Sequence, residues 1–524
     1  MTPRGEDLHG TDLLMLLVGS LAITTLARRL NWSAPLLLVA VGLAVAFIPG
    51  MPKFEIEPDL ILLLVLPPLL YSAALDSSYL NIRANLRPIG LLSVGLVLAT
   101  MTAVGFVAHM LIPGMSLAAA FVLGAVVAPP DAVAAVTIGR KLGLPRRTMT
   151  ILAGESLAND ATALTAFRVA LAAATGEAAV SFGNSVTMFL VSAVGGIVIG
   201  YVLGVVVHAA RMRIGDGVLE SALGMLVPFG TYLLAESVET SGVLAVVVAG
   251  LYLGHNAPRA GYATRLQETA VWRSADVLLE SLVFALIGLQ LPSVITSDIS
   301  APVILGAVVL LVVTIVVRFV WMFPGAYVPV YLSKRIKANE RGPGWRDVVV
   351  LSWAGMRGVV SLAAASAIPP SMPGRNVIVF CTFVITVGTL LIQGLSLPWV
   401  IRKLGVRGQE QQSDALAEAQ VQHRAAEVSV TRLDEAIEDQ SAPEYIVERL
   451  RSVAEMRGNA AWERLGRQEI ESPAAAHRRL RRVMLEAERE VFVAARDARE
   501  IDDEVLRRVL RELDLEEAKL SRDE

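Results

Sequence analysis

The side chains best suited to chemistry lie in one apolar stretch that reads Gly-Glu-Ser-Leu-Ala-Asn-Asp-Ala-Thr at positions 154–162. If this stretch is a helix, Ser156 and Asp160 are four residues apart and share one face, while Glu155, Asn159 and Thr162 share the neighbouring face. A carboxylate beside a hydroxyl offers hard oxygen ligands to a cation. We therefore expect Asp160 and Ser156 to bind a monovalent cation, with main-chain carbonyls from a nearby broken helix completing the site.

The position of Asp160 in an apolar stretch also matters for protons. Burial disfavours the charged form of a carboxyl group, so such a group can bind a proton or a sodium ion near neutral pH, but not both. That competition is sufficient to couple two ion fluxes in opposite directions. The structural alternative is a hydrogen-bonded acid that ties helices together.

Composition identifies the surroundings of these residues as a membrane. The 524 residues are 54% hydrophobic and only 18% charged, whereas a soluble chain carries about 25% charged residues. Apolar segments long enough to span about 30 Å of hydrocarbon as helices recur about thirteen times, so we expect an all-α protein with many membrane-spanning helices. They lie near 12–28, 34–50, 58–76, 86–112, 117–139, 148–175, 183–208, 217–237, 241–255, 274–292, 301–330, 347–368 and 376–400.

Basic residues predict the orientation of these spans. Alternate loops between them hold eighteen Lys and Arg, and the intervening loops hold only Lys53 and Arg375. Since cytoplasmic loops are enriched in Lys and Arg, we expect a multi-pass protein of the cell (plasma) membrane, with its amino terminus outside and its carboxyl tail in the cytoplasm. The first span has its positive charges after its apolar run, so we interpret it as a true span instead of a signal peptide.

The seventh span can act as a connector between spans 1 to 6 and spans 8 to 13, which then run in opposite directions. This is the inverted-repeat plan of many secondary transporters. The fifth and twelfth spans correspond under it, and both contain helix breakers, at 128–131 (Ala-Pro-Pro-Asp) and 355–358 (Gly-Met-Arg-Gly). Paired broken helices predict an ion site near the membrane midplane, with Asp131 at the same depth as Asp160.

Other charges inside the spans need partners because each costs at least about 2.5 kcal/mol to insert. We assign Arg357 to Glu155 as a structural ion pair. The alternative is that Arg357 neutralises Asp160 directly, which would suppress proton binding. For Arg168 and Arg318, a packing or interfacial role is as plausible as a functional one.

Three further acids, Glu236, Asp276 and Glu280, lie in spans outside the predicted core. We interpret them as packing residues or as residues that line a funnel. No motif surrounds them.

With these residues identified, the chain resembles the bacterial branch of the monovalent cation:proton antiporter family that includes the sodium/proton exchangers. The resemblance covers about residues 12–405. It is carried by 154–164 in the sixth span, by Leu-Pro-Pro-Leu-Leu-Tyr at 66–71 in the third, and by Trp-Ala-Gly-Met-Arg-Gly-Val-Val-Ser-Leu at 353–362 in the twelfth. The adjacent Asn159 and Asp160 are similar to the electroneutral members, whereas electrogenic relatives have two aspartates.

The resemblance implies roles residue by residue. Asp160 would be the carrier carboxylate with Asn159 as its neighbour, Ser156 a side-chain ligand, and Glu155 with Arg357 the core ion pair. Main-chain oxygen near Pro130, with Asp131 close by, would complete the cation site. The resemblance also implies a homodimer and an elevator-like movement of a core against a dimer scaffold.

Two positions depart from the family pattern. Many relatives have a glutamate after the aromatic residue of the third-span motif, where this chain has Ser72. The fifth-span pattern usually reads Asp-Pro, whereas here Asp131 precedes Ala132 and two prolines come first. The sequence therefore leaves sodium and potassium open as the exchanged cation.

The end of the chain has a different character. Residues 406–524 hold 20 of the 46 Lys and Arg and 28 of the 49 Asp and Glu. Amphipathic patterns predict helices after a capping-box signal at Ser441 and Glu444 and after Ser472. We therefore expect two domains, a transmembrane antiporter domain at 1–405 and a helical cytoplasmic tail at 406–524 with a regulatory or dimer-supporting role.

The sequence also limits the alternatives. One cysteine, Cys381, excludes an intramolecular disulfide and a Cys-rich metal site, and a net charge of -3 does not fit a basic nucleic-acid binder. An intramembrane hydrolase with Ser156 as nucleophile would need a histidine base, for which His109, His208 and His255 lie at span ends. We expect no enzyme activity and no resident cofactor; the ligands would be H⁺ and Na⁺, Li⁺ or K⁺. A membrane ion sensor that signals through the tail stays open.

Overall fold

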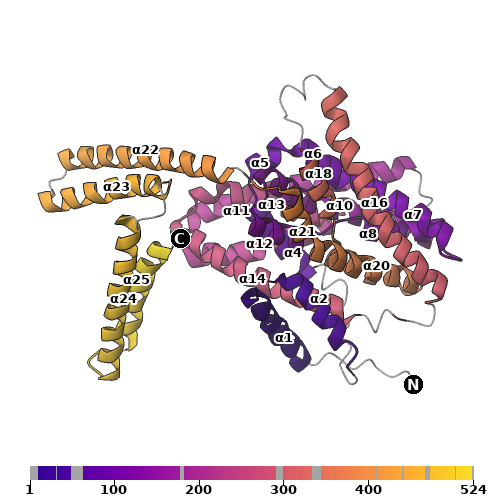
Figure 1. Cartoon of the computed structure of the whole chain (residues 1–524), viewed down its shortest axis with the longest axis horizontal. Coiled ribbons are helices and arrows are strands. Elements are labelled where there is room, and N and C mark those ends of the chain that lie inside the picture. Colours follow the sequence, from indigo (N-terminus) through magenta and orange to yellow (C-terminus); the bar gives the residue numbers. More distant parts are fainter. Residues whose placement is uncertain are drawn as a thin grey trace. The chain divides into compact units, whose positions relative to one another are not determined.

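A computed structural model describes residues 10–30, 32–48, 63–176, 182–290, 295, 299–332, 344–408, 410–439, 442–465, 473–501 and 503–521. All regular secondary structure in these ranges is helical, which confirms the expected all-α fold (Figure 1). The chain divides into two compact units, Met1–Gly408 and Gln409–Glu524.

The first unit consists of apolar helices. Those before the middle of the chain are α1 (Gly10–Arg29), α2 (Ala34–Val45), α4 (Leu66–Leu75), α5 (Tyr79–Ala84), α6 (Leu86–Gly90), η1 (Leu91–Leu96), α7 (Val97–Leu111), α8 (Leu117–Val127), α9 (Val133–Leu142), α10 (Arg146–Thr175) and α11 (Phe182–Ile214). They are followed by α12 (Gly217–Ser237), α13 (Gly242–Asn256), η2 (Ala257–Arg259), α14 (Tyr262–Leu289), α16 (Ala301–Leu332), α18 (Trp345–Trp353), α19 (Val359–Ser366), α20 (Arg375–Thr389), η3 (Leu390–Gly394) and α21 (Leu395–Leu404).

Six helical segments of the described chain are long and apolar enough to cross a membrane: Thr11–Arg29, Leu86–Leu111, Val186–Ile214, Gly217–Ser237, Ala301–Leu332 and Arg375–Leu404. Three shorter apolar helices, α2, α4 and α8, accompany them. The number thirteen stays a prediction. Part of its basis, residues 58–62 of the third span and the loop residues Lys53, Lys334, Arg335, Lys337 and Arg341, lies outside the described residues.

Both expected helix breaks are confirmed. The α8 helix ends at Val127 and α9 begins at Val133, while α18 ends at Trp353 and α19 begins at Val359. Two consecutive prolines at 129 and 130 remove the amide donors that would continue α8. The chain therefore runs as unwound backbone through both segments, which leaves main-chain polar groups available inside an apolar unit.

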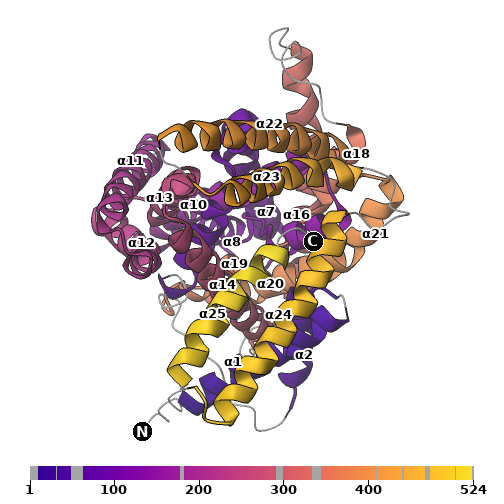
Figure 2. The same ribbon diagram turned by 90° about the vertical axis from the view of Figure 1, so that its left-hand side faces the viewer.

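Two groups of helices surround these breaks. One contains α7, α8, α10, α16 and α20, which pack against one another, and the other contains α2, α4, α12, α13 and α14 (Figures 1 and 2). Helices α2 and α14 approach closely because small residues face each other: a Cβ atom at Gly288 would lie 2.6 Å from the Val39 carbonyl oxygen. Helix α14 also packs against α4 and α19, where it forms one wall of the site described below.

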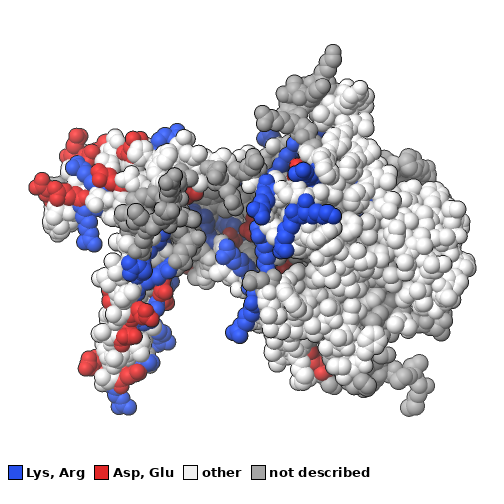
Figure 3. All heavy atoms as spheres, viewed as in Figure 1, with Lys and Arg blue, Asp and Glu red and all other residues white. Residues whose placement is uncertain are grey.

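The second unit contains α22 (Glu410–Asp439), α23 (Glu444–Leu465), α24 (Pro473–Asp497) and α25 (Asp503–Ser521). Helix α22 packs along α23, and α24 packs along α25. Arg481 of α24 joins the latter pair through a bond of 2.9 Å to Glu516 of α25, and it also bonds to Glu488 of its own helix at 2.8 Å. The predicted capping residues Ser441 and Ser472 lie outside the described residues. Figure 3 shows charged side chains over this unit, whereas most of the visible surface of the first unit is uncharged.

Candidate ion-binding site

The two unwound segments of the first unit touch each other. The amide of Asp131 donates to the carbonyl of Met356 at 2.7 Å. A Cβ atom at Gly358 would lie 1.8 Å from a carboxylate oxygen of Asp131, so only glycine fits this crossing. The Asp131 carboxylate also accepts from the Val133 amide at 2.9 Å and thereby covers an orphan donor at the start of α9.

Arg357 lies in the crossing and binds main-chain oxygens. It is 1% exposed, and its Nε donates to Val127 O at 3.0 Å while Nη2 donates to Ala128 O at 3.4 Å. A further bond runs from Nη1 to Gly355 O. The guanidinium therefore satisfies carbonyls at the carboxyl end of α8, where a helix dipole favours a positive charge.

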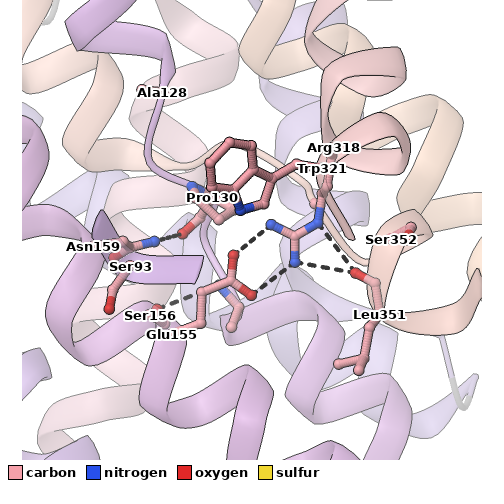
Figure 4. A network of polar contacts seen from close by, with 12 residues as sticks. Ser93, Ala128, Pro130, Glu155, Ser156, Asn159, Arg318, Trp321, Leu351 and Ser352 are labelled. Atoms are coloured by element: carbon pink, nitrogen blue, oxygen red, sulfur yellow. Dashed lines mark hydrogen bonds and ion pairs between the residues drawn. The ribbon is translucent and has the colours of Figure 1, made fainter. Parts of the chain in front are cut away.

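Glu155 forms an ion pair as expected, but Arg357 is not its partner. Glu155 pairs with Arg318 on α16, through Nη1–Oε1 at 2.5 Å and Nη2–Oε2 at 2.8 Å (Figure 4). Arg318 also donates to Leu351 O at 3.1 Å and 3.0 Å, at the carboxyl end region of α18. The physical reason is geometric, because the Arg318 fork reaches both carboxylate oxygens while the donors of Arg357 are used by unwound backbone.

Arg318 is thus the functional residue that sequence reasoning left undecided. Its side chain is 1% exposed and that of Glu155 is 2% exposed, so neither charge could persist there alone. An arginine in an apolar span signals a buried acid as its partner. Spacing along the chain gives no means of choosing between two such arginines.

Asn159 and Ser156 face the unwound segment between α8 and α9. The Asn159 amide donates to Pro130 O at 2.6 Å, and the Ser156 hydroxyl accepts from the Ala132 amide at 3.5 Å (Figure 4). The Pro130 oxygen predicted as a cation ligand therefore has one hydrogen bond already, and it retains a second lone pair. Asn159 Oδ1 is buried and has no hydrogen-bond partner among the described residues.

Asp160 lies one residue further along α10 and is 7% exposed. Its carboxylate faces a cavity of about 240 Å³, and its main electrostatic neighbour is another acid, Asp131. Within the described chain no cation pairs with it. Desolvation and a like charge both oppose an uncompensated carboxylate, so this group needs a proton or a cation to neutralise it.

The cavity has walls from several helices. Asp131, Ser156 and Asp160 line one side; α4 contributes Ser72 and Asp76, and α14 contributes Asp276 and Glu280. The structure thus brings the predicted cation ligands together and adds two of the acids that the sequence had left as packing or funnel residues. Glu236 lies elsewhere, in an ion pair with Arg168 at 2.6 Å.

The chemistry available here suits a hard monovalent ion. Among the described residues no cluster of three or more His, Cys, Asp and Glu side chains could hold a metal ion. The cavity offers instead single carboxylates, hydroxyls and main-chain carbonyls from a broken helix. Such a mixed oxygen set can bind an alkali cation and release it.

Comparisons with known proteins agree with this geometry. Residues 14–403 match the family of the transmembrane sodium/hydrogen exchangers. An uncharacterized Na⁺/H⁺ exchanger of Mycobacterium tuberculosis is 35% identical over 98% of this chain and 97% of its own length. The Na⁺/H⁺ antiporter ApNhaP of Aphanothece halophytica is 30% identical over 81% of this chain and 80% of that protein.

A solved structure shows the same fold. The sodium proton antiporter MjNhaP1 of Methanocaldococcus jannaschii superposes with a TM-score of 0.58 at 18% identity. The match covers 75% of this chain and 97% of that one.

Proposed function

Because the chain belongs to the sodium/hydrogen exchanger family, we propose that it is a secondary antiporter that exchanges sodium or lithium ions for protons across the cell membrane. The observation that carries the proposal is Asp160, a carboxylate without a cationic partner in the described chain, facing a cavity beside two crossed helix breaks. Proton and cation compete for this carboxylate, with Ser156, the Pro130 carbonyl and Asp131 as further oxygens around the cation.

The neighbouring polar groups hold the site in shape. Asn159 fixes the unwound segment through its bond to Pro130, and an amide does not titrate. Glu155 with Arg318 ties α10 to α16, and Arg357 holds the carboxyl end of α8. With Asp160 as the one titrating carrier, each cycle moves one monovalent cation against one proton and transfers no net charge.

The hydrolase alternative has no support in this geometry. His109 bonds to the Met115 carbonyl at 2.8 Å, while His208 and His255 contact the rings of Tyr252 and Tyr79. None of the three histidines lines the cavity that contains the Ser156 hydroxyl. None of these three histidines is therefore placed to act as the base for Ser156.

We also propose the arrangement in the cell. Residues 1–405 are the antiporter domain in the lipid bilayer, and 406–524 form a cytoplasmic tail, with the amino terminus outside. The excess of Lys and Arg in alternate loops supports this orientation. A homodimer with an elevator-like core movement follows from the family resemblance.

The test is ion exchange by the purified chain in liposomes that contain a pH-sensitive dye. An outward sodium or lithium gradient should acidify the lumen, and the reverse gradient should make it alkaline; potassium is measured in parallel. Asp160→Asn should abolish exchange, because a neutral amide can neither release a proton nor balance the cation. Exchange at wild-type rate by a folded Asp160→Asn protein would refute the proposal. Sodium binding without any flux in the wild type would favour the ion sensor instead.

A further inference from the structure

The wall that α14 contributes to the cavity carries acids that the proposed cycle does not use. Asp276 and Glu280 are four residues apart on α14, so they share one face of this helix, and both line the cavity that contains Asp160. Asp276 is held in place from α4, where the Ser72 hydroxyl donates to its Oδ2 at 2.7 Å. This wall therefore presents a positioned carboxylate to the same space as the carrier.

Two oxygen atoms on this side are buried without partners. Asp276 Oδ1 and the Ser361 hydroxyl have no hydrogen bond within the described chain, and Ser361 on α19 is only 1% exposed. Ser361 lines the same cavity as Asp276. A buried polar atom without a partner costs about 1–3 kcal/mol, so such atoms normally meet water or a ligand.

The elements that carry these atoms meet at the cavity. Ala363 of α19 packs with Val65, next to α4, and with Val283 of α14 in one small apolar cluster. The cluster fixes α19 against the wall formed by α4 and α14. Arg140 is the one basic side chain among the residues that line the cavity, against the five acids Asp76, Asp131, Asp160, Asp276 and Glu280. The space therefore attracts cations and repels anions.

We propose that Asp276, positioned by Ser72, and Ser361 form a second binding station for the alkali cation, from which the ion passes across the cavity to Asp160. Glu280 adds negative charge one turn away. The proposal deepens the exchange function proposed above and rests on it. The ligand is a partly hydrated monovalent cation, because the station offers few protein oxygens and leaves room for water.

The position of Ser72 provides a specific test of the station. Its hydroxyl lies 2.7 Å from the Asp276 carboxylate, so a carboxylate on either α4 or α14 would lie in nearly the same place. If the station requires a carboxylate at this place, whichever helix carries it, then exchanging the side chains of Ser72 and Asp276 should preserve cation binding. The double variant Ser72→Glu with Asp276→Ser makes this exchange.

Transport measurements test the station first. In proteoliposomes with an imposed pH gradient, Asp276→Asn should raise the KM for sodium about tenfold, equivalent to about 1.4 kcal/mol, with a much smaller effect on the maximal rate. The Ser361→Ala variant should raise KM in the same direction, and the Ser72→Glu/Asp276→Ser exchange should return KM toward the wild-type value. Glu236→Gln removes an acid outside the cavity and serves as the matched control with unchanged KM.

Binding separates this proposal from the exchange mechanism itself. In the inactive Asp160→Asn protein, sodium chloride should still raise the melting temperature above that in choline chloride, because ligands stabilise the state they bind. Adding Asp276→Asn should abolish this difference. A sodium effect that survives Asp276→Asn, or an unchanged KM in a folded Asp276→Asn protein, would overturn the station and leave the role of Asp160 untouched.

Discussion

Replacing Arg318 with methionine should strongly destabilise the first unit. Glu155 would lose both of its bonds, at 2.5 and 2.8 Å, while its side chain stays 2% exposed, and Leu351 O would lose two donors. Removing one partner of a buried ion pair costs about 3–5 kcal/mol because the remaining charge is uncompensated. Arg318→Met should lower the free energy of unfolding by about that amount, measured by tryptophan fluorescence during denaturation in detergent.

The ion pair should be visible as a coupling. Glu155→Gln alone should also destabilise, but in the double variant with Arg318→Met no charge is left unpaired, so the loss should be smaller than the sum. Coupling between residues in contact reaches about 0.5–3 kcal/mol, and we expect a value near the upper end. Additive losses would refute the pair. A stronger coupling of Glu155 to Arg357→Met than to Arg318→Met would restore the partner expected from the sequence.

Three other predictions follow from the geometry. With equal sodium and pH on both sides of proteoliposomes, a potassium/valinomycin potential should drive no sustained sodium uptake, because the proposed cycle has Asp160 as its one titrating carrier. A charge moved through 100 mV would gain about 2.3 kcal/mol, so sustained uptake would reveal a second titrating group. Gly358→Ala should cost about 1–3 kcal/mol of stability and lower exchange activity, because its Cβ would lie 1.8 Å from Asp131, and Asp131→Ser in the same chain should relieve part of the loss of stability. In the tail, the hydrogen bond from Arg481 lowers the pKa of Glu516, so the stability gained from this pair is present at neutral pH and lost as pH falls through that lowered pKa. Backbone amide hydrogen exchange in α24 and α25, corrected for intrinsic rates, should become faster in acid. This increase should be smaller in the Arg481→Met variant than in the wild type.

The sequence was informative wherever local chemistry determines local structure. The prolines at 129 and 130 lack the amide donors that would continue α8 beyond Val127, and the polar stripe from 154 to 162 lies on one long helix, α10. These features predicted where the helices break and which helix carries Asp160. The inverted-repeat plan then predicted that the two broken segments correspond to each other.

Contacts between residues far apart in the sequence were harder to predict. Glu155 and Arg318 are 163 residues apart, and the sequence held another buried arginine, Arg357, that suited the acid equally well in charge. The link between Ser72 and Asp276 spans 204 residues and carries no motif. Such contacts depend on which helix faces meet. In helices that are apolar on all sides, the hydrophobic pattern does not distinguish one face from another.

The placement of the two arginines suggests why exchange is obligatory. Arg318 is used by Glu155 and by α18, and Arg357 by the end of α8, so neither charge compensates Asp160. An empty Asp160 is then a lone anion, whereas a bound proton or a bound sodium neutralises this carboxylate. Carrying a lone charge past an apolar barrier costs at least about 2.5–3.5 kcal/mol, which slows the empty core about 100-fold. In the proposed cycle only the two loaded forms therefore cross at a useful rate. We expect that an Arg318 or Arg357 released from its present partners would neutralise Asp160 and so permit uncoupled movement.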